Sequence, residues 1–67
     1  MAIGRRVGVR IQRLRRDRNL SQETLARRAG ISRGYLARLE IGRHEPSLTT
    51  LSKLARALKV KVTELLE

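Results

Sequence analysis

The stretch from Ser21 to Glu40 contains two short amphipathic patterns separated by a glycine, and this feature restricts the fold more than any other. Apolar residues recur at helical spacing on both sides of Gly30. Gly30 can adopt the positive φ that ends a helix, and Ala26 is small enough for two helices to approach closely. The stretch therefore predicts two helices that meet at a tight turn, with inward stripes formed by Leu25, Ala26 and Ala29 and by Leu36 and Leu39.

The second of these helices has an outward face with two arginines and little other bulk. Its four outward positions follow an i, i+1, i+4, i+5 spacing, which places them on one side of a helix: Arg33, Gly34, Ala37 and Arg38. A guanidinium binds planar acceptor groups through two parallel hydrogen bonds. This face is therefore suited to insertion into a groove of another molecule.

Apolar periodicity predicts three further helices around this pair. Gly4 and Gly8 are expected to weaken the first helix and to let its start fray. Ser47 is a suitable N-cap for the fourth helix, as Ser21 and Ser32 are for the second and third. At 67 residues the chain is expected to form one all-α domain over residues 1–67. The apolar faces are assigned to Ile3, Val7, Ile11 and Leu14 in the first helix, Leu48, Leu51, Leu54, Ala55 and Leu58 in the fourth, and Val62, Leu65 and Leu66 in a short fifth.

The charge of the chain favours an anionic partner. Sixteen basic residues, thirteen of them arginine, stand against six acidic ones and give a net charge of +10. Arginine binds phosphate strongly, so nucleic acid is the leading partner, although an anionic membrane surface or an acidic protein would also suit this charge. Tyr35 is the only aromatic residue, so the aromatic set that stacks on unpaired bases is absent and duplex DNA is favoured.

The order and spacing of many residues are similar to those of a known family. The matching residues are Leu20-Ser21-Gln22, Leu25-Ala26, Gly30-Ile31-Ser32, Tyr35-Leu36, Leu39-Glu40, Gly42, Pro46-Ser47, Leu51, Leu54-Ala55, Leu58 and Leu65-Leu66. From about Ile11 to Leu66 the chain resembles the phage-repressor and Cro-like (XRE-type) helix-turn-helix family, which includes restriction–modification controller proteins. The resemblance implies a five-helix repressor-like domain whose helices 2 and 3 form the helix-turn-helix. It also implies a homodimeric regulator of transcription that binds a palindromic operator in double-stranded DNA, with helix 3 in the major groove.

Nine residues are candidates for contact with DNA. From the start of the third helix Arg33 can reach O6 and N7 of guanine, and Arg38 is the second candidate for base reading, with phosphate contact as the alternative for both. Gly34 departs from the family, in which polar side chains often occupy the matching position, so one base contact is expected to be absent. The full set is Ser21, Gln22, Ser32, Arg33, Gly34, Tyr35, Arg38, Arg43 and His44.

The resemblance implies backbone contacts for several members of this set. The glutamine matching Gln22 touches a phosphate and braces a base-reading side chain in the family, whereas an ordinary helix-start residue is the alternative. The Tyr35 hydroxyl is expected to meet a phosphate unless its ring packs at the domain surface. Arg43 and His44 lie in a loop expected to face the sugar–phosphate backbone, and a solvated loop residue is the alternative for His44.

The resemblance also implies one ion pair and one self-contact. In the family, the arginine that matches Arg15 pairs with the glutamate that matches Glu40, and two solvated side chains are the alternative. Family members dimerise through the region that here contains Leu58, Val60, Val62, Leu65 and Leu66.

Other function classes lack the residues that they need. The six acidic residues are scattered singly and no glycine-rich phosphate loop follows a strand, so an enzyme is not expected. With no cysteine and His44 as the sole histidine, neither a metal site nor another cofactor is expected. No apolar run approaches the ~20 residues of a membrane span. Neither a membrane nor a small-molecule ligand is an expected partner, and the resemblance implies a cytoplasmic location at the nucleoid. Two alternatives remain open, namely an antitoxin-type module that binds DNA and protein and a nonspecific nucleic-acid binder.

Overall fold

The computed structural model describes residues 2–67, with side chains from Arg5 onward. In this part of the chain there are five helices and no strand: α1 (Ala2–Asp17), α2 (Gln22–Ala29), α3 (Arg33–Glu40), α4 (Leu48–Leu58) and α5 (Val62–Leu65). The prediction of an all-α, five-helix domain is confirmed. Within residues 2–67 no helix has both the length and the hydropathy needed to cross a membrane.

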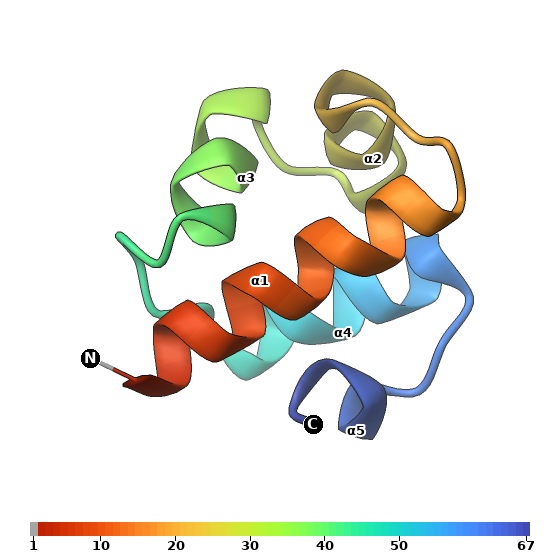
Figure 1. Ribbon diagram of the computed structural model, residues 1–67. Helices are drawn as coiled ribbons and strands as arrows, with labels where there is room; N and C mark the ends of the chain where they lie inside the picture. Colours follow the sequence, from red (N-terminus) through yellow and green to blue (C-terminus); the bar gives the residue numbers. More distant parts are fainter. Residues whose placement is uncertain (1) are drawn as a thin grey trace.

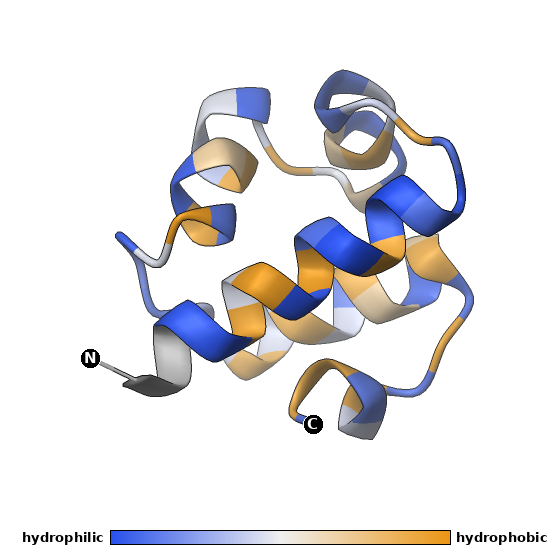
Figure 2. Cartoon of the chain, viewed as in Figure 1, coloured by the Kyte–Doolittle hydropathy of each residue, from blue (hydrophilic) through white to orange (hydrophobic). Residues whose placement is uncertain are grey.

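Helix α1, the longest helix, crosses the centre of the view in front of α4 (Figure 1). It packs against α3, α4 and α5, while α2 packs against α3 and α4. Apolar and polar residues alternate along the helices (Figure 2), and the buried apolar residues of all five helices form one core. Each fully buried leucine or isoleucine contributes about 2 kcal/mol through burial. The core consists of Val7, Ile11, Leu14, Leu25, Ala26, Ala29, Leu36, Leu39, Leu51, Leu54, Ala55, Leu58 and Leu65.

Three serines begin three of the helices as the sequence predicts. The hydroxyl oxygens of Ser21 and Ser32 accept hydrogen bonds from the backbone N–H groups of Thr24 and Tyr35, both at 3.0 Å. Ser47 accepts the N–H of Thr50 at 3.1 Å. Each cap satisfies a helix N–H that has no partner within the helix, so the three N-cap predictions are confirmed.

Positive-φ residues follow the C-terminal ends of four helices. Gly30 (φ 72°) and Gly42 (φ 78°) follow α2 and α3, as expected of glycine. Asn19 (φ 56°) follows α1 and Lys59 (φ 60°) follows α4, and the sequence analysis identified neither. At Lys59 the conformation is closed by a hydrogen bond from the Val60 N–H to the Ala55 carbonyl at 2.9 Å. A lysine in the left-handed conformation costs about 1 kcal/mol. This conformation ends α4 and turns the chain toward α5.

Gly8 has a role that its helix propensity does not reveal. A Cβ at this position would lie 2.2 Å from the carbonyl oxygen of Leu39 and 2.8 Å from that of Glu40. Because such distances are too short for a real Cβ, only glycine lets α1 approach the end of α3 this closely. The interpretation of Gly8 as a mere weak point is therefore incomplete. The side chain of Ile3, the first member of the predicted stripe, lies outside the described side chains.

Leu48 corrects the predicted apolar face of the fourth helix. Its side chain is 71% exposed, whereas the remaining residues of the stripe, from Leu51 to Leu58, are buried. Leu48 occupies the first position of α4, directly after residues 41–47, whose side chains are exposed or half-buried. The periodic pattern extends one turn beyond the part of the helix that other helices cover.

Candidate nucleic-acid interface

The turn between α2 and α3 sets the orientation of the second helix. Gly30 adopts the left-handed conformation, and the next N–H, that of Ile31, bonds to the Ala26 carbonyl at 3.0 Å. The Ile31 side chain is half-buried and packs against the core. Leu36 and Leu39 are buried on the inner side of α3. These contacts fix which side of α3 faces outward.

The outer side of α3 is exposed and basic. Arg33, Gly34 and Arg38 are exposed, and Ala37 is half-buried. A Cβ built on Gly34 would lie 3.5 Å from Nη1 of Arg38, so the Arg38 guanidinium lies over the position that a side chain at residue 34 would occupy. The structure thus brings the two arginines and the glycine of the predicted set together on one protruding surface.

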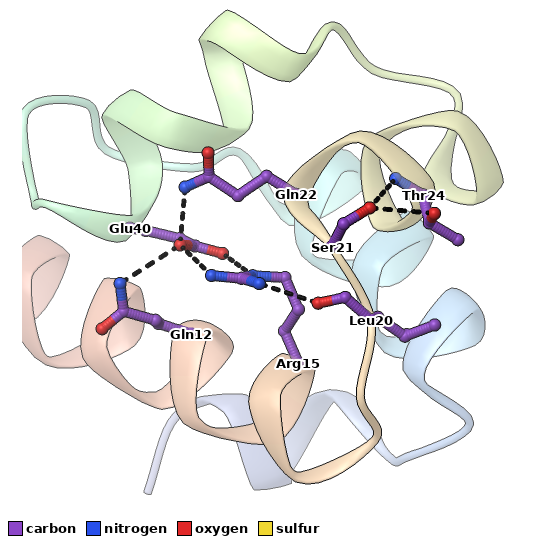
Figure 3. Close-up of polar contacts among 7 residues, drawn as sticks. All are labelled: Gln12, Arg15, Leu20, Ser21, Gln22, Thr24 and Glu40. Carbon is purple, nitrogen blue, oxygen red and sulfur yellow. Dashed lines mark hydrogen bonds and ion pairs between the residues drawn. The ribbon is translucent and has the colours of Figure 1, made fainter.

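A buried ion pair connects α1 to the end of α3 (Figure 3). Arg15 donates from Nε to Oε2 of Glu40 at 2.7 Å and from Nη2 to Oε1 at 3.1 Å. Its Nη1 donates to the Leu20 carbonyl at 2.7 Å. Arg15 is 8% exposed and Glu40 is 3% exposed. The structure therefore brings the two residues together as a buried pair rather than as two solvated side chains.

Two glutamines complete the coordination of the Glu40 carboxylate. Gln22 Nε2 donates to Oε1 at 2.9 Å and Gln12 Nε2 donates to the same oxygen at 3.4 Å. Gln22 thereby joins α2 to α3, so its amide nitrogen is oriented inward. Gln12 was missed by the sequence analysis, although it lies one helical turn before Arg15 on the same face of α1.

Tyr35 packs against the domain instead of extending freely into solvent. Its side chain is half-buried against the core, and its hydroxyl lies 3.5 Å from Oγ1 of Thr50. Its ring meets the His44 ring edge to face, with centroids 5.8 Å apart. Of the two alternatives for Tyr35, the packed ring describes the structure better.

The remaining DNA candidates lie at the ends of the helices. The hydroxyls of Ser21 and Ser32 serve as N-caps of α2 and α3, and Ser21 Oγ also donates to Thr24 Oγ1 at 2.9 Å. Arg43 and His44 are exposed in the segment between α3 and α4. No cluster of three or more potential metal ligands occurs among the described residues.

The predicted dimer region divides into a buried part and an accessible part. Leu58 and Leu65 are fully buried in the core of the protomer, so their assignment to a dimer interface is corrected. Val60 and Val62 are half-buried, and Leu66 is 52% exposed. Helix α5 is a single turn, and at its start the Glu64 carboxylate accepts a hydrogen bond from the Lys61 N–H at 2.9 Å.

Comparison with known proteins gives matches over most of the chain. Residues 11–65 match the helix-turn-helix family HTH_3. An immunity repressor protein of Bacillus phage phi105 is 47% identical over 57 residues, which cover 85% of this chain and 40% of the repressor. An uncharacterised HTH-type transcriptional regulator of Sinorhizobium fredii is 48% identical over 59 residues, covering 88% of this chain and 77% of the regulator. The chain thus spans less than half of the phage repressor.

Two solved structures share the complete fold. The restriction–modification controller protein C.AhdI from Aeromonas hydrophila superimposes with a TM-score of 0.94 at 40% identity, covering 97% of this chain and 98% of the controller. The biofilm regulator SinR, solved in complex with DNA, gives a TM-score of 0.87 at 34% identity, covering 91% of this chain and 98% of SinR.

Proposed function

The chain belongs to the helix-turn-helix family HTH_3, as the resemblance predicted, and on this premise we propose that it is a sequence-specific regulator of transcription that binds double-stranded DNA. Its relatives include transcriptional regulators and a phage repressor. One observation carries the proposal: α3 presents Arg33, Gly34 and Arg38 outward from a firmly packed inner side. A protruding basic helix of this kind fits the major groove.

Base reading is assigned to the outer side of α3. Arg33 at the first position of the helix can donate both arms of its guanidinium to O6 and N7 of guanine. Arg38 lies five residues later, with its guanidinium above Gly34, and is the second residue assigned to base reading. The absence of a side chain at Gly34 lets the helix backbone and Arg38 approach the base edges.

Phosphate contacts are assigned to the residues around this surface. The first-turn N–H groups of α2 and α3, next to Ser21 and Ser32, favour an anion. Arg43 and His44 are exposed beyond the other end of α3 and can reach the same backbone. Gln22 is proposed to contact a phosphate through its amide oxygen, because its amide nitrogen is engaged by Glu40.

A homodimer on a palindromic operator completes the proposal. Two copies of α3 would enter successive major grooves about 34 Å apart. The contact between protomers is assigned to Val60, Val62 and Leu66, the accessible apolar residues of the C-terminal region. Because each protomer carries a charge of +10, the dimer is expected to be stronger on DNA, which neutralises this charge, than in free solution. Such a regulator would act in the cytoplasm, in contact with the nucleoid.

Selection of bound duplexes from a random pool at physiological salt tests each part of the proposal. A palindromic consensus, bound about 10³-fold more tightly than random duplex, is the expected result. Enrichment without any consensus would contradict sequence-specific regulation and indicate a nonspecific binder. A consensus containing a single unrepeated half-site would leave specific recognition intact and contradict the dimer.

A further inference from the structure

The outer face of α1 carries a dense row of arginines that the DNA proposal does not use. Arg5, Arg6, Arg13 and Arg16 are exposed, and Val9 lies among them with 54% of its side chain accessible. The buried residues of α1 lie on the opposite side of the helix. The row extends over about three helical turns.

This face has two open hollows, and Val9 is the apolar side chain that lines both of them. One hollow of about 460 Å³ is lined by Arg5, Arg6, Val9, Arg10, Arg13 and Glu67. A second, of about 290 Å³, is lined by Val9, Gln12, Arg13, Arg16 and Asp17. Since both hollows include Val9 and Arg13, they adjoin and form one groove along α1, which we call the α1 groove.

The α1 groove is separate from the outer side of α3. Gly8, Gln12 and Arg15 meet the end of α3, and the backbone of Arg5 lies against Gly42 in the loop that follows α3. Val9, Arg13 and Arg16 each follow one of these residues directly, and one residue turns a side chain by about 100° around an α-helix. The part of the groove formed by Val9, Arg13 and Arg16 therefore opens to the side of the contact between α1 and α3, whereas its Arg5 end adjoins the loop that follows α3.

The C-terminal end of the chain already shows how the groove binds carboxylates. Arg10 donates from Nε to the Glu64 carbonyl at 2.9 Å and from Nη2 to the Glu67 carboxylate at 3.3 Å. These contacts tie α1 to α5 and hold an acidic side chain at the rim of the larger hollow. Arg6 donates from Nη2 to the backbone oxygen of Glu67 at 3.3 Å, whereas the exposed guanidiniums of Arg5 and Arg13 offer the same chemistry to another molecule.

We propose that the α1 groove is a docking site for an acidic, amphipathic segment of a partner protein. The carboxylates of the segment pair with Arg5 and Arg13, and one of its apolar side chains rests on Val9. A second copy of this chain is a poor occupant, because the same face of that copy would set arginine against arginine. A phosphate backbone is less suitable, since it gains nothing from contact with the apolar Val9 side chain.

The test uses fluorescence anisotropy with three labelled probes and the complete chain. The first probe is a short peptide with glutamates on one helical face and leucines on the other. The second is the same peptide with serines in place of the leucines, and the third is random-sequence duplex DNA. Arg13→Ala is compared with Arg28→Ala, which removes an exposed arginine from α2, and Val9→Ser is compared with Leu48→Ser, which removes an exposed apolar side chain elsewhere.

The leucine peptide is expected to bind more tightly than the serine peptide. Arg13→Ala should weaken its binding about fivefold and Arg28→Ala less than twofold, since one charge-assisted contact is lost only in the first case. Val9→Ser should weaken the leucine peptide alone, and Leu48→Ser neither peptide. Equal effects of the two arginine variants, or equal binding of the two peptides, would overturn the proposal. It would also be overturned if Arg13→Ala weakened duplex DNA more than the leucine peptide, because the groove would then belong to nucleic acid.

Discussion

The inner and outer sides of α3 belong to one eight-residue helix but differ in their surroundings. On the inner side, Leu36, Leu39 and Glu40 are buried, and the polar atoms of Glu40 all have partners. On the outer side, Arg33, Gly34 and Arg38 are exposed. The inner side thus anchors α3 to the rest of the domain, whereas the side chains of the outer side are available to contact another molecule. Substitutions on the two sides should therefore separate stability from recognition.

The largest effect is expected from Glu40→Gln. The variant keeps the shape of the side chain but leaves the Arg15 guanidinium buried without its counter-charge and sets amide hydrogens against Arg15 and Gln22. The free energy of unfolding should fall by about 3–5 kcal/mol, measured by urea denaturation. Glu45→Gln is the matched control, because Glu45 is exposed in the loop and should change stability by less than about 0.5 kcal/mol. Equal effects in the two variants would show that the Glu40 network does not stabilise the inner side of α3.

Gly8→Ala comes next and tests the inner side from α1. The added methyl group would overlap the carbonyl oxygens of Leu39 and Glu40, both of which belong to the backbone and cannot rotate away. The two helices must separate, at a cost of about 3 kcal/mol in the free energy of unfolding. Thermal denaturation followed by circular dichroism measures this loss. Unchanged or increased stability would mean that α1 and α3 do not approach as closely as described.

Arg33→Ala should leave stability unchanged and weaken DNA binding, unlike the two variants above. Removal of an exposed side chain should leave the urea midpoint unchanged, whereas affinity for the selected operator should fall by about 1–3 kcal/mol and affinity for random duplex only slightly. Competition binding with both duplexes measures the difference. Equal losses on both duplexes would assign Arg33 to phosphate rather than to a base.

The sequence predicted which residues lie on each side of α3, because the features that determine this are local. The serine caps, Gly30 at the turn and the stripe of Leu36 and Leu39 each depend on residues within a few positions of one another. The outward direction of Arg33 and Arg38 follows from the same periodicity. The pairing of Arg15 with Glu40 came from the family resemblance, since 25 positions separate the two residues.

The features that the sequence did not reveal depend on contacts between distant segments. The propensity of Gly8 indicates only a weak helix, because its reason lies in the end of α3. Periodicity assigned Leu48, Leu58 and Leu65 to faces but did not tell which would be covered within one protomer. Nothing in the local sequence indicates that Gln12 donates a hydrogen bond to Glu40. Lysine is also not a residue type that typically ends a helix with a positive φ, as Lys59 does.

Arg43→Ala should have a smaller effect that does not depend on DNA sequence. Arg43 is exposed in the loop after α3, beyond the base-reading side. Loss of one phosphate contact should weaken binding to every duplex and lower the slope of log affinity against log salt by about one unit. A salt titration with operator and random duplex measures the slope. An unchanged slope would show that Arg43 does not contact DNA.

Gly34→Ala should give the smallest effect and one opposite in sign to that of Gly8→Ala. Both variants replace a helical glycine by alanine, which by propensity alone stabilises a helix by about 0.5–1 kcal/mol. At Gly34 the new methyl group meets only the Arg38 guanidinium, at the ordinary contact distance of 3.5 Å, so a gain should appear in urea denaturation, at the lower end of this range because Gly34 lies in the first turn of α3. At Gly8 the same gain is outweighed by overlap with the α3 backbone. A loss of stability in both variants would show that the two sides of α3 do not differ as described, whereas opposite signs would place the difference in packing and not in helix propensity.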